Sequence, residues 1–294
     1  MRVYICGVKE RWSTERLVEE FSSRGHETEA VELDQTSLEI NQGRFLYQGR
    51  ELQIPDLVLV KRIGRGPMPG MNKRLNFLWW WEQHGAKVFS PTSALSIAFD
   101  RIQTNIMVSL LGIPTPETLI TENVSRAIGF LREHGRVILR SPNTNEGRRG
   151  QEFKLADLDS FNFVLMELIK QNNLPFVIQE YLEEAVTAHH LVLLDGKFVG
   201  AYQQREIQQT WQEDIVLSDQ IEIVQPRKEE IEAAEKIAQK MELFYADIEI
   251  LVDRRGRYFF TDLDTYSGYE PVERVAGKPL TVMIADHLLA KVES

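Results

Sequence analysis

The first ninety residues alternate between short apolar runs typical of strands and longer amphipathic runs typical of helices. The run RVYICGV precedes the helical pattern STERLVEEFSSRGHE, and the runs TEAVEL and PDLVLVKRIG follow it. Parallel neighbouring strands need a crossover connection, which is usually a helix. The alternation therefore predicts an α/β layer with a parallel sheet, and the helix MNKRLNFLWWWEQHG and the strand KVFS extend it. We place the end of this first domain at residue 95.

The remaining two thirds of the chain mix helical runs with strands that pair as hairpins, so an α+β arrangement is expected there. One helix is predicted over residues 93–112, in SALSIAFDRIQTNIMVSLLG. A hairpin is predicted in AHHLVLLDGKFVGAYQQREI, because an Asp-Gly pair favours a tight turn. A second hairpin is predicted in ADIEILVDRRGRYFFTDLD.

Charge and cysteine content exclude several functional classes. The net charge of −10 argues against a general nucleic-acid binder, whose footprint would be basic. The single cysteine, Cys6, cannot form an internal disulfide and fits a reducing compartment. The N-terminus has no signal-peptide pattern, and the chain has no apolar run of about 18 residues that could cross a membrane. A cytoplasmic protein without nucleic-acid or membrane partners is expected.

Four acidic residues alternate with apolar ones in the last predicted hairpin. Asp247 and Glu249 share one face of the first strand, and Asp262 and Asp264 share one face of the second. Like charges opposed on neighbouring strands are destabilising unless a cation neutralises them. Carboxylate oxygens without sulfur or imidazole favour Mg²⁺ or Mn²⁺ over zinc. The alternative interpretation is an acidic strip that faces solvent on an ordinary hairpin.

The order of several motifs resembles the ATP-grasp superfamily, in particular the RimK-like ligases that join a carboxylate to an amine. The strand PDLVLVKRIG resembles that family's strand with an Arg-Ile-Gly loop, and RVILRSPNTNEGRRGQEF resembles its strand and Gly-rich phosphate loop. FVIQEYLEEA resembles its adenine hinge, and the acidic hairpin its metal-binding strands. The N-terminal pattern is also similar to the RimK-like subgroup of the GAK system. The resemblance implies an N-terminal pre-ATP-grasp domain (1–95), a central lid subdomain (96–178) and a C-terminal subdomain (179–294).

The resemblance also assigns roles to particular residues. Glu249, Asp262 and Asp264 would hold magnesium that bridges the phosphates of ATP. Arg62 would face the carboxylate of the substrate, and Arg205 would stand in for an arginine expected near the acyl phosphate. The residues implied in nucleotide binding are Arg101, Arg140 and Arg148 at the phosphates, Gln179, Glu180, Tyr181 and Leu182 at adenine, Glu183 or Glu184 at the ribose, and His189 in the cleft.

Some positions depart from the family pattern and leave alternatives open. Arg101 and Arg140 replace two lysines, and a planar guanidinium fork differs in geometry from a point charge. Leu191 stands where the family has an arginine. These changes motivate a second hypothesis, a nucleotide-binding regulator without turnover. A dinucleotide oxidoreductase is a third, but the chain has neither a G-x-G-x-x-G turn nor a P-loop. If the ligase reading holds, the substrates are small-molecule or peptide carboxylates and amines, and the resemblance implies a homodimer or homotetramer.

Overall fold

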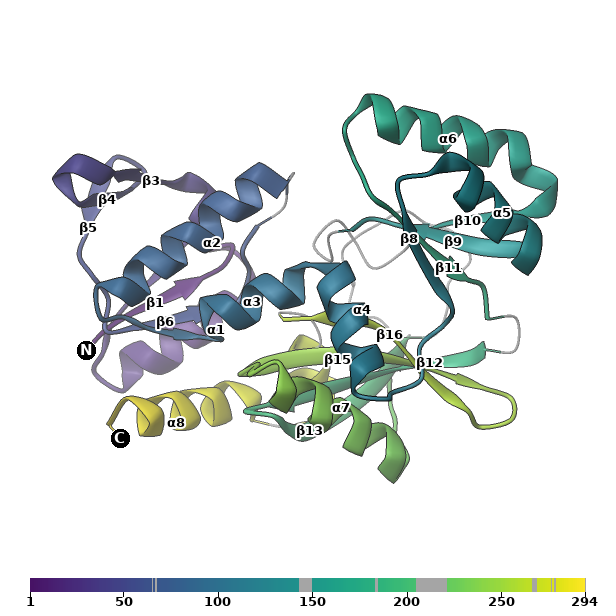
Figure 1. Cartoon of the computed structure of the whole chain (residues 1–294). Coiled ribbons are helices and arrows are strands. Elements are labelled where there is room, and N and C mark those ends of the chain that lie inside the picture. The colour runs from purple at the N-terminus through teal and green to yellow at the C-terminus, as the bar shows by residue number, and fades with distance from the viewer. Residues whose placement is uncertain are drawn as a thin grey trace. The chain divides into compact units, whose positions relative to one another are not determined.

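The computed structural model describes residues 1–64, 66, 68–142, 150–182, 185–204, 221–265, 269–275, 277 and 279–293 (Figure 1). The chain forms two compact units, each built from separate stretches of sequence. The first unit comprises Met1–Ser96, His189–Ile248 and Asp264–Ser294, and the second comprises Ile97–Ala188 and Glu249–Leu263. The three-segment division expected from the sequence stays a prediction.

The first unit begins with the predicted parallel α/β layer, which the structure confirms. Its sheet has the order β2-β1-β6-β7, and all three pairings are parallel. The strands are β1 (Arg2–Cys6), β2 (Glu27–Val31), β6 (Leu57–Val60) and β7 (Lys87–Phe89). The helices of this stretch are α1 (Trp12–Ser23), α2 (Met68–Gln83) and α3 (Thr92–Phe99). Gly25 and Gly85 follow α1 and α2 with φ of 84° and 93°, so they end these helices in a backbone conformation that suits glycine.

A small antiparallel sheet of three strands, which was not predicted from the sequence, lies between β2 and β6 along the chain. Its order is β3-β4-β5, with β3 (Thr36–Glu39), β4 (Arg44–Tyr47) and β5 (Arg50–Leu52). Two short 3₁₀ turns, η1 (Leu33–Gln35) and η2 (Ile40–Gln42), flank β3. The ring of Phe45 on β4 contacts the buried Trp81 of α2, with 4.4 Å between ring centroids, and this contact packs the small sheet on the helix.

The second unit contains an antiparallel sheet of four strands in the order β10-β9-β11-β8. The strands are β8 (Thr118–Thr121), β9 (Arg136–Arg140), β10 (Gln151–Lys154) and β11 (Phe176–Glu180). The helices are α4 (Arg101–Leu110), α5 (Val124–His134) and α6 (Leu158–Lys170), with the 3₁₀ turn η4 (Leu155–Asp157) before α6. Buried side chains of α5 and α6, such as Leu131 and Phe161, pack with Ile178 of the sheet into one core.

The predicted hairpins belong to a five-stranded sheet of order β14-β13-β12-β15-β16. The strands are β12 (Ala185–Leu194), β13 (Lys197–Gln204), β14 (Ile221–Ile223), β15 (Tyr245–Asp253) and β16 (Tyr258–Asp264). The first hairpin turns at Asp195 and Gly196, whose φ values of 51° and 69° are typical of a two-residue hairpin turn. The later helices are α7 (Lys228–Lys240), the π-helical turn η5 (Pro271–Val275) and α8 (Leu280–Glu293).

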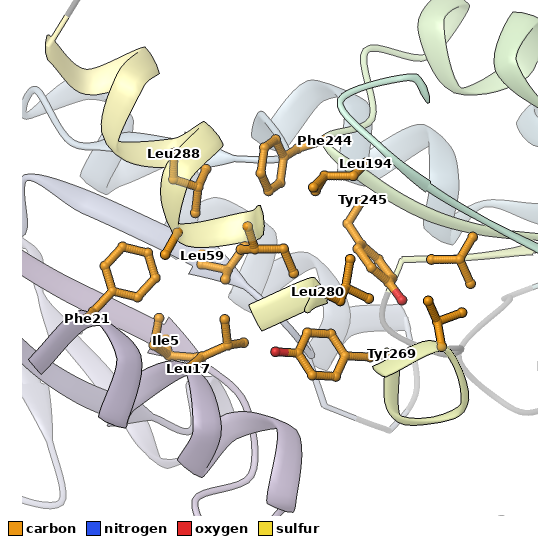
Figure 2. Packing of buried hydrophobic residues seen from close by; sticks show 14 of the residues in the cluster. Ile5, Leu17, Phe21, Leu59, Leu194, Phe244, Tyr245, Tyr269, Leu280 and Leu288 are labelled. Carbon is orange, nitrogen blue, oxygen red and sulfur yellow. The ribbon is translucent and has the colours of Figure 1, made fainter. Parts of the chain in front are cut away.

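One hydrophobic core joins the sequence-distant stretches of the first unit. Figure 2 shows Leu17 and Phe21 of α1 in the same cluster as Leu288 of α8, and Leu59 of β6 in the cluster with Leu194 and Phe244. All of these side chains are almost completely buried. Burial of this kind contributes roughly 1.5–3 kcal/mol for each large apolar side chain, as an upper estimate. The N-terminal parallel layer therefore folds together with the C-terminal helix.

The single helix predicted over residues 93–112 is wrong. The structure has two helices, α3 and α4, with Asp100 between them in an extended conformation. The carboxylate of Asp100 accepts hydrogen bonds from the backbone N–H groups of Ile102 (2.8 Å) and Gln103 (3.1 Å). An aspartate that caps the N-terminus of a helix in this way stabilises a new start. No helix in the described part of the chain is long and apolar enough to span a lipid bilayer.

Candidate functional site

Two guanidinium groups in the second unit converge on one carboxylate. Asp262 Oδ2 lies 3.3 Å from Arg101 Nη1, 3.4 Å from Arg101 Nη2 and 3.8 Å from Arg140 Nη1. All three side chains are buried, Arg101 to 2% and Asp262 to 3% exposure. Buried charges are costly unless they are paired, so the carboxylate offsets part of the cost of burying two cations. Among these three side chains the positive charges outnumber the negative by one, which favours the binding of an anion.

The local fold explains why these arginines meet. Arg101 is the first residue of α4, directly after the capping Asp100, and Arg140 is the last residue of β9. The Nε of Arg101 donates a hydrogen bond to the carbonyl of Ser141 (2.9 Å), and its backbone N–H donates to the carbonyl of Pro142 (2.9 Å). The start of the helix is therefore fixed to the end of the strand. Asp262 enters from β16, and its Oδ1 accepts a hydrogen bond from the N–H of Leu263 (2.9 Å).

The predicted metal ligands are carboxylates in the middle of β15 and in the last part of β16. Glu249 is half-buried and accepts a hydrogen bond from Thr261 Oγ1 at 2.6 Å, while Asp262 and Asp264 are buried. An all-oxygen donor set of this kind fits a hard cation such as Mg²⁺. Among the residues that the structure describes, no three His, Cys, Asp or Glu side chains gather closely enough to form a metal site. The assignment of these three acids as ligands stays a prediction.

The predicted adenine hinge follows β11. Gln179 is buried, its Nε2 donates to Thr118 Oγ1 (3.2 Å), and its Oε1 has no hydrogen-bond partner within the described stretches. A buried carbonyl oxygen of this kind is able to accept a hydrogen bond from a ligand. The N–H of Tyr181 donates to the carbonyl of Arg136 (3.1 Å), and the Arg136 guanidinium lies 3.5 Å from the Tyr181 ring centroid. This stacking fixes the chain after the strand.

The hinge is also fixed at its acidic residue. Glu180 Oε1 accepts a hydrogen bond from the N–H of Glu117 (2.9 Å), and the N–H of Glu180 donates to the carbonyl of Glu117 (2.9 Å). Leu182 is half-buried. The nucleotide roles of Gln179, Glu180, Tyr181 and Leu182 stay predictions.

In the first unit, the loop after β6 begins with two cationic residues. The backbone N–H groups of Lys61 and Arg62 both donate to the carbonyl of Cys6, at 2.8 and 2.7 Å. The ammonium group of Lys61 lies over the rings of Tyr245 (4.8 Å) and Tyr269 (4.3 Å). Desolvation by burial lowers the pKa of Lys61 to about 7, although nearby carboxylates oppose the shift. Arg62 is half-buried, at the carboxyl end of a parallel strand where open α/β sheets bind ligands. Lys61 is not among the site residues predicted from the sequence.

The adjacent histidines of β12 contact different carboxylates. His189 Nδ1 lies 2.7 Å from Glu230 Oε2 on α7. Neighbouring residues of a strand point to opposite faces, so a different partner is expected for His190. His190 Nδ1 lies 3.3 Å from Asp247 Oδ1, and the hydroxyl of Tyr202 donates to Asp247 Oδ2 at 2.9 Å. Asp247 is completely buried, so these contacts satisfy both of its oxygens.

Four residues with predicted roles, Arg148, Glu183, Glu184 and Arg205, lie outside the residues that the structure describes. The roles expected of Arg62 and His189 are not tested by their contacts and stay predictions. The pairing of Asp262 with Arg101 and Arg140 was not foreseen from the sequence. Its only sequence indication is the sign of the charges, because 161 residues separate Arg101 from Asp262.

Comparison with known proteins decides the family. Residues 105–254, just over half of the chain, match the family described as "Prokaryotic glutathione synthetase, ATP-grasp domain". The chain belongs to this ATP-grasp family. Residues 1–68 match the RimK PreATP-grasp domain, and this stretch contains the strands β1, β2 and β6 of the parallel layer. The resemblance to RimK-like ATP-grasp ligases and the expected fold class are confirmed.

Curated relatives of this ATP-grasp protein include glutamate ligases. A probable alpha-L-glutamate ligase from Cellvibrio japonicus is 24% identical over 292 residues, which cover 98% of this chain and 95% of the relative. The tetrahydromethanopterin:alpha-L-glutamate ligase of Methanosarcina acetivorans is 21% identical over 217 residues, which cover 70% of this chain and 67% of that enzyme.

Solved structures share the whole fold. The RimK domain ATP-grasp protein from Sphaerobacter thermophilus superimposes with a TM-score of 0.73 at 17% identity, covering 98% of this chain and 100% of that one. The macrocyclase MdnC of Microcystis aeruginosa, bound to its precursor peptide MdnA, gives 0.74 at 15% identity, with 99% and 100% covered. The ligase PsnB, solved with Mg and ADP, gives 0.69 at 18% identity, covering 99% of this chain and 98% of that one.

Proposed function

We propose that this ATP-dependent ligase, which joins a carboxylate to an amine, uses L-glutamate as its carboxylate substrate and also accepts it as the amine. The main support for the ligase reaction is that residues 1–68 and 105–254 match the two parts of a RimK-like ATP-grasp protein. The buried cluster of Arg101, Arg140 and Asp262 supports it, because phosphoryl transfer requires fixed positive charge. The names of the curated relatives support glutamate.

The reaction proceeds by two displacements. An oxygen of the substrate carboxylate attacks the γ-phosphorus of ATP, the bond from that phosphorus to the bridging oxygen of ADP breaks, and an acyl phosphate forms. The amine nitrogen then attacks the acyl carbon and loses a proton, and the carbon–oxygen bond to phosphate breaks. Phosphate leaves with one oxygen that came from the carboxylate. No protein nucleophile is needed, so positioning and charge stabilisation supply the catalysis.

The described residues supply charge and orientation in this scheme. Arg101 and Arg140 would bind phosphate oxygens of ATP, and Asp262 would keep both guanidinium groups in place. Magnesium, held by Glu249, Asp262 and Asp264, would neutralise charge on the phosphates. Gln179 would accept a hydrogen bond from adenine through its buried Oε1. Arg62 would bind the substrate carboxylate.

The test is ADP release by the purified protein with ATP and magnesium, over a panel of the common L-amino acids and carboxylic acids. L-Glutamate should give the highest rate. Arg62→Gln should raise the KM for the acid, whereas Arg50→Gln should not, because Arg50 pairs with Glu29 at the exposed surface. Tight ATP binding without ADP release for any member of the panel would instead support the nucleotide-binding regulator, which no comparison favours.

A further inference from the structure

Three glycines of the loop after β6 and the start of α2 surround the guanidinium group of Arg74. A Cβ atom added to Gly64 would lie 3.1 Å from Arg74 Nη1 and 3.4 Å from its Cζ. A Cβ atom added to Gly66 or to Gly70 would lie 3.7 Å from Arg74 Nη2. Arg74 itself is on α2 and is 8% exposed. The guanidinium of Arg74 therefore lies against the main chain at these three glycines, in the space that a side chain at each position would need.

The backbone of this loop adopts conformations that suit glycine. Gly64 has φ of 90° and Gly66 has φ of 130°, which other L-residues rarely adopt. A loop with such glycines has many alternative conformations in isolation, so it needs external contacts to hold one of them. The side chain of Arg74 is a planar group with five N–H donors, which suits it to fix nearby main chain.

The opposite end of the loop is fixed independently. The N–H groups of Lys61 and Arg62 donate to the carbonyl of Cys6 on β1, and Ile63 is buried to 1% exposure. Arg62 thus lies in a segment that is attached to β1 before it and packed against Arg74 after it. The segment that carries Arg62 is therefore held at both ends, by Cys6 of β1 on one side and by Arg74 at Gly64 on the other.

We propose that Arg74 is a positioning residue that holds the main chain at Gly64, Gly66 and Gly70 and thereby orients Arg62 toward the substrate carboxylate. This inference rests on the proposed function for the role of Arg62. A loop that is already ordered loses less conformational freedom when the substrate binds. Removing the guanidinium should therefore weaken substrate binding through Arg62 even though Arg74 does not touch the substrate.

A double-mutant cycle tests the contact itself. Gly64→Ala should lower the midpoint of thermal unfolding by a larger amount in the wild-type background than in the Arg74→Met background, because shortening Arg74 removes the close approach. Gly66→Ala is the matched control. It carries a similar backbone strain but no contact closer than 3.7 Å, so its effect should be the same in both backgrounds. Equal effects of Gly64→Ala in the two backgrounds would overturn the proposal.

Steady-state kinetics test the positioning role. Arg74→Met should raise the KM for L-glutamate by about tenfold or more, with kcat and the KM for ATP nearly unchanged. Arg74→Lys keeps the charge without the planar fork and should recover only part of this loss. A KM for L-glutamate that stays at the wild-type value in a folded Arg74→Met variant would refute the role.

The two proposals fail in distinguishable ways. If the wild-type protein released no ADP with L-glutamate, the proposed substrate would be wrong. The coupling between Arg74 and Gly64 would then still decide whether Arg74 fixes the loop. If the wild-type protein used L-glutamate and the Arg74 variants had unchanged KM values, only the positioning role would be lost.

Discussion

Replacing Asp262 by asparagine should destabilise the protein by several kcal/mol in the absence of any nucleotide or metal. The substitution keeps the shape of the side chain and removes its charge, so both buried guanidinium groups lose the attraction of this carboxylate. The distances of 3.3 Å to Arg101 and 3.8 Å to Arg140 correspond to Coulomb attractions of about 5 and 4 kcal/mol at an effective dielectric constant of about 20.

Desolvation offsets most of that attraction while the pair is intact, but the desolvation of the arginines remains once the carboxylate charge is gone. We therefore expect a loss of about 3–5 kcal/mol in the free energy of unfolding, the range typical of a broken buried pair. At about 2–4 °C per kcal/mol, the midpoint of thermal unfolding should fall by roughly 6–20 °C. Circular dichroism with a chelator present measures both quantities.

Glu152→Gln is the matched control, because it makes the same chemical change in the same unit. Glu152 pairs with Arg136 at 2.8 Å, but 39% of its side chain is exposed. An exposed pair is worth about 0–1 kcal/mol. If Asp262→Asn were no more destabilising than Glu152→Gln, the reasoning that Asp262 stabilises two buried cations would be refuted.

Three further predictions follow from the titratable groups of the first unit. The pKa of Lys61 is about 7 in the fold against an ordinary value of 10.5, so the folded chain binds fewer protons than the unfolded chain between these values. The free energy of unfolding should therefore rise with pH across this window, and Lys61→Met should abolish the rise in urea titrations. Desolvation raises the pKa of Glu230, but hydrogen bonds from His189 and Arg227 outweigh it and lower the pKa below the ordinary 4.5. The contribution of ionised Glu230 to the free energy of unfolding is present above pH 4.5 and should disappear as the pH falls through the lowered pKa. The Glu230→Gln variant should show no such acid-dependent loss. Burial raises the pKa of the Cys6 thiol, so a thiol reagent should label native protein very slowly and denatured protein stoichiometrically, and rapid native labelling would contradict this.

The elements that were predicted correctly are those determined by residues close together in the sequence. The parallel layer of β1, β2 and β6 and the turn at Asp195 and Gly196 followed from apolar runs, helix stops and turn residues. The break at Asp100 was missed because the apolar pattern continues through it, and the capping hydrogen bonds outweigh that pattern. The strands of the small sheet carry too few apolar residues in succession to stand out from a loop.

Long-range contacts could not be predicted in the same way. The acidic and basic residues of the site were found by type, but the sequence does not show that Asp262 meets Arg101 and Arg140. Nor does it show that Arg74 lies against Gly64. Such contacts depend on tertiary packing between residues that are far apart in the chain or on different elements, and no local periodicity encodes them.

The transfer of an oxygen atom from the carboxylate to phosphate tests the ligase reaction most directly. The protein is incubated with ATP, magnesium and L-glutamate whose carboxylates carry ¹⁸O, and the released phosphate is examined by mass spectrometry. An acyl phosphate intermediate predicts one ¹⁸O atom in each phosphate and one amide bond formed for each ADP. Unlabelled phosphate alongside amide formation would contradict it, because the carboxylate would then not have attacked the γ-phosphorus.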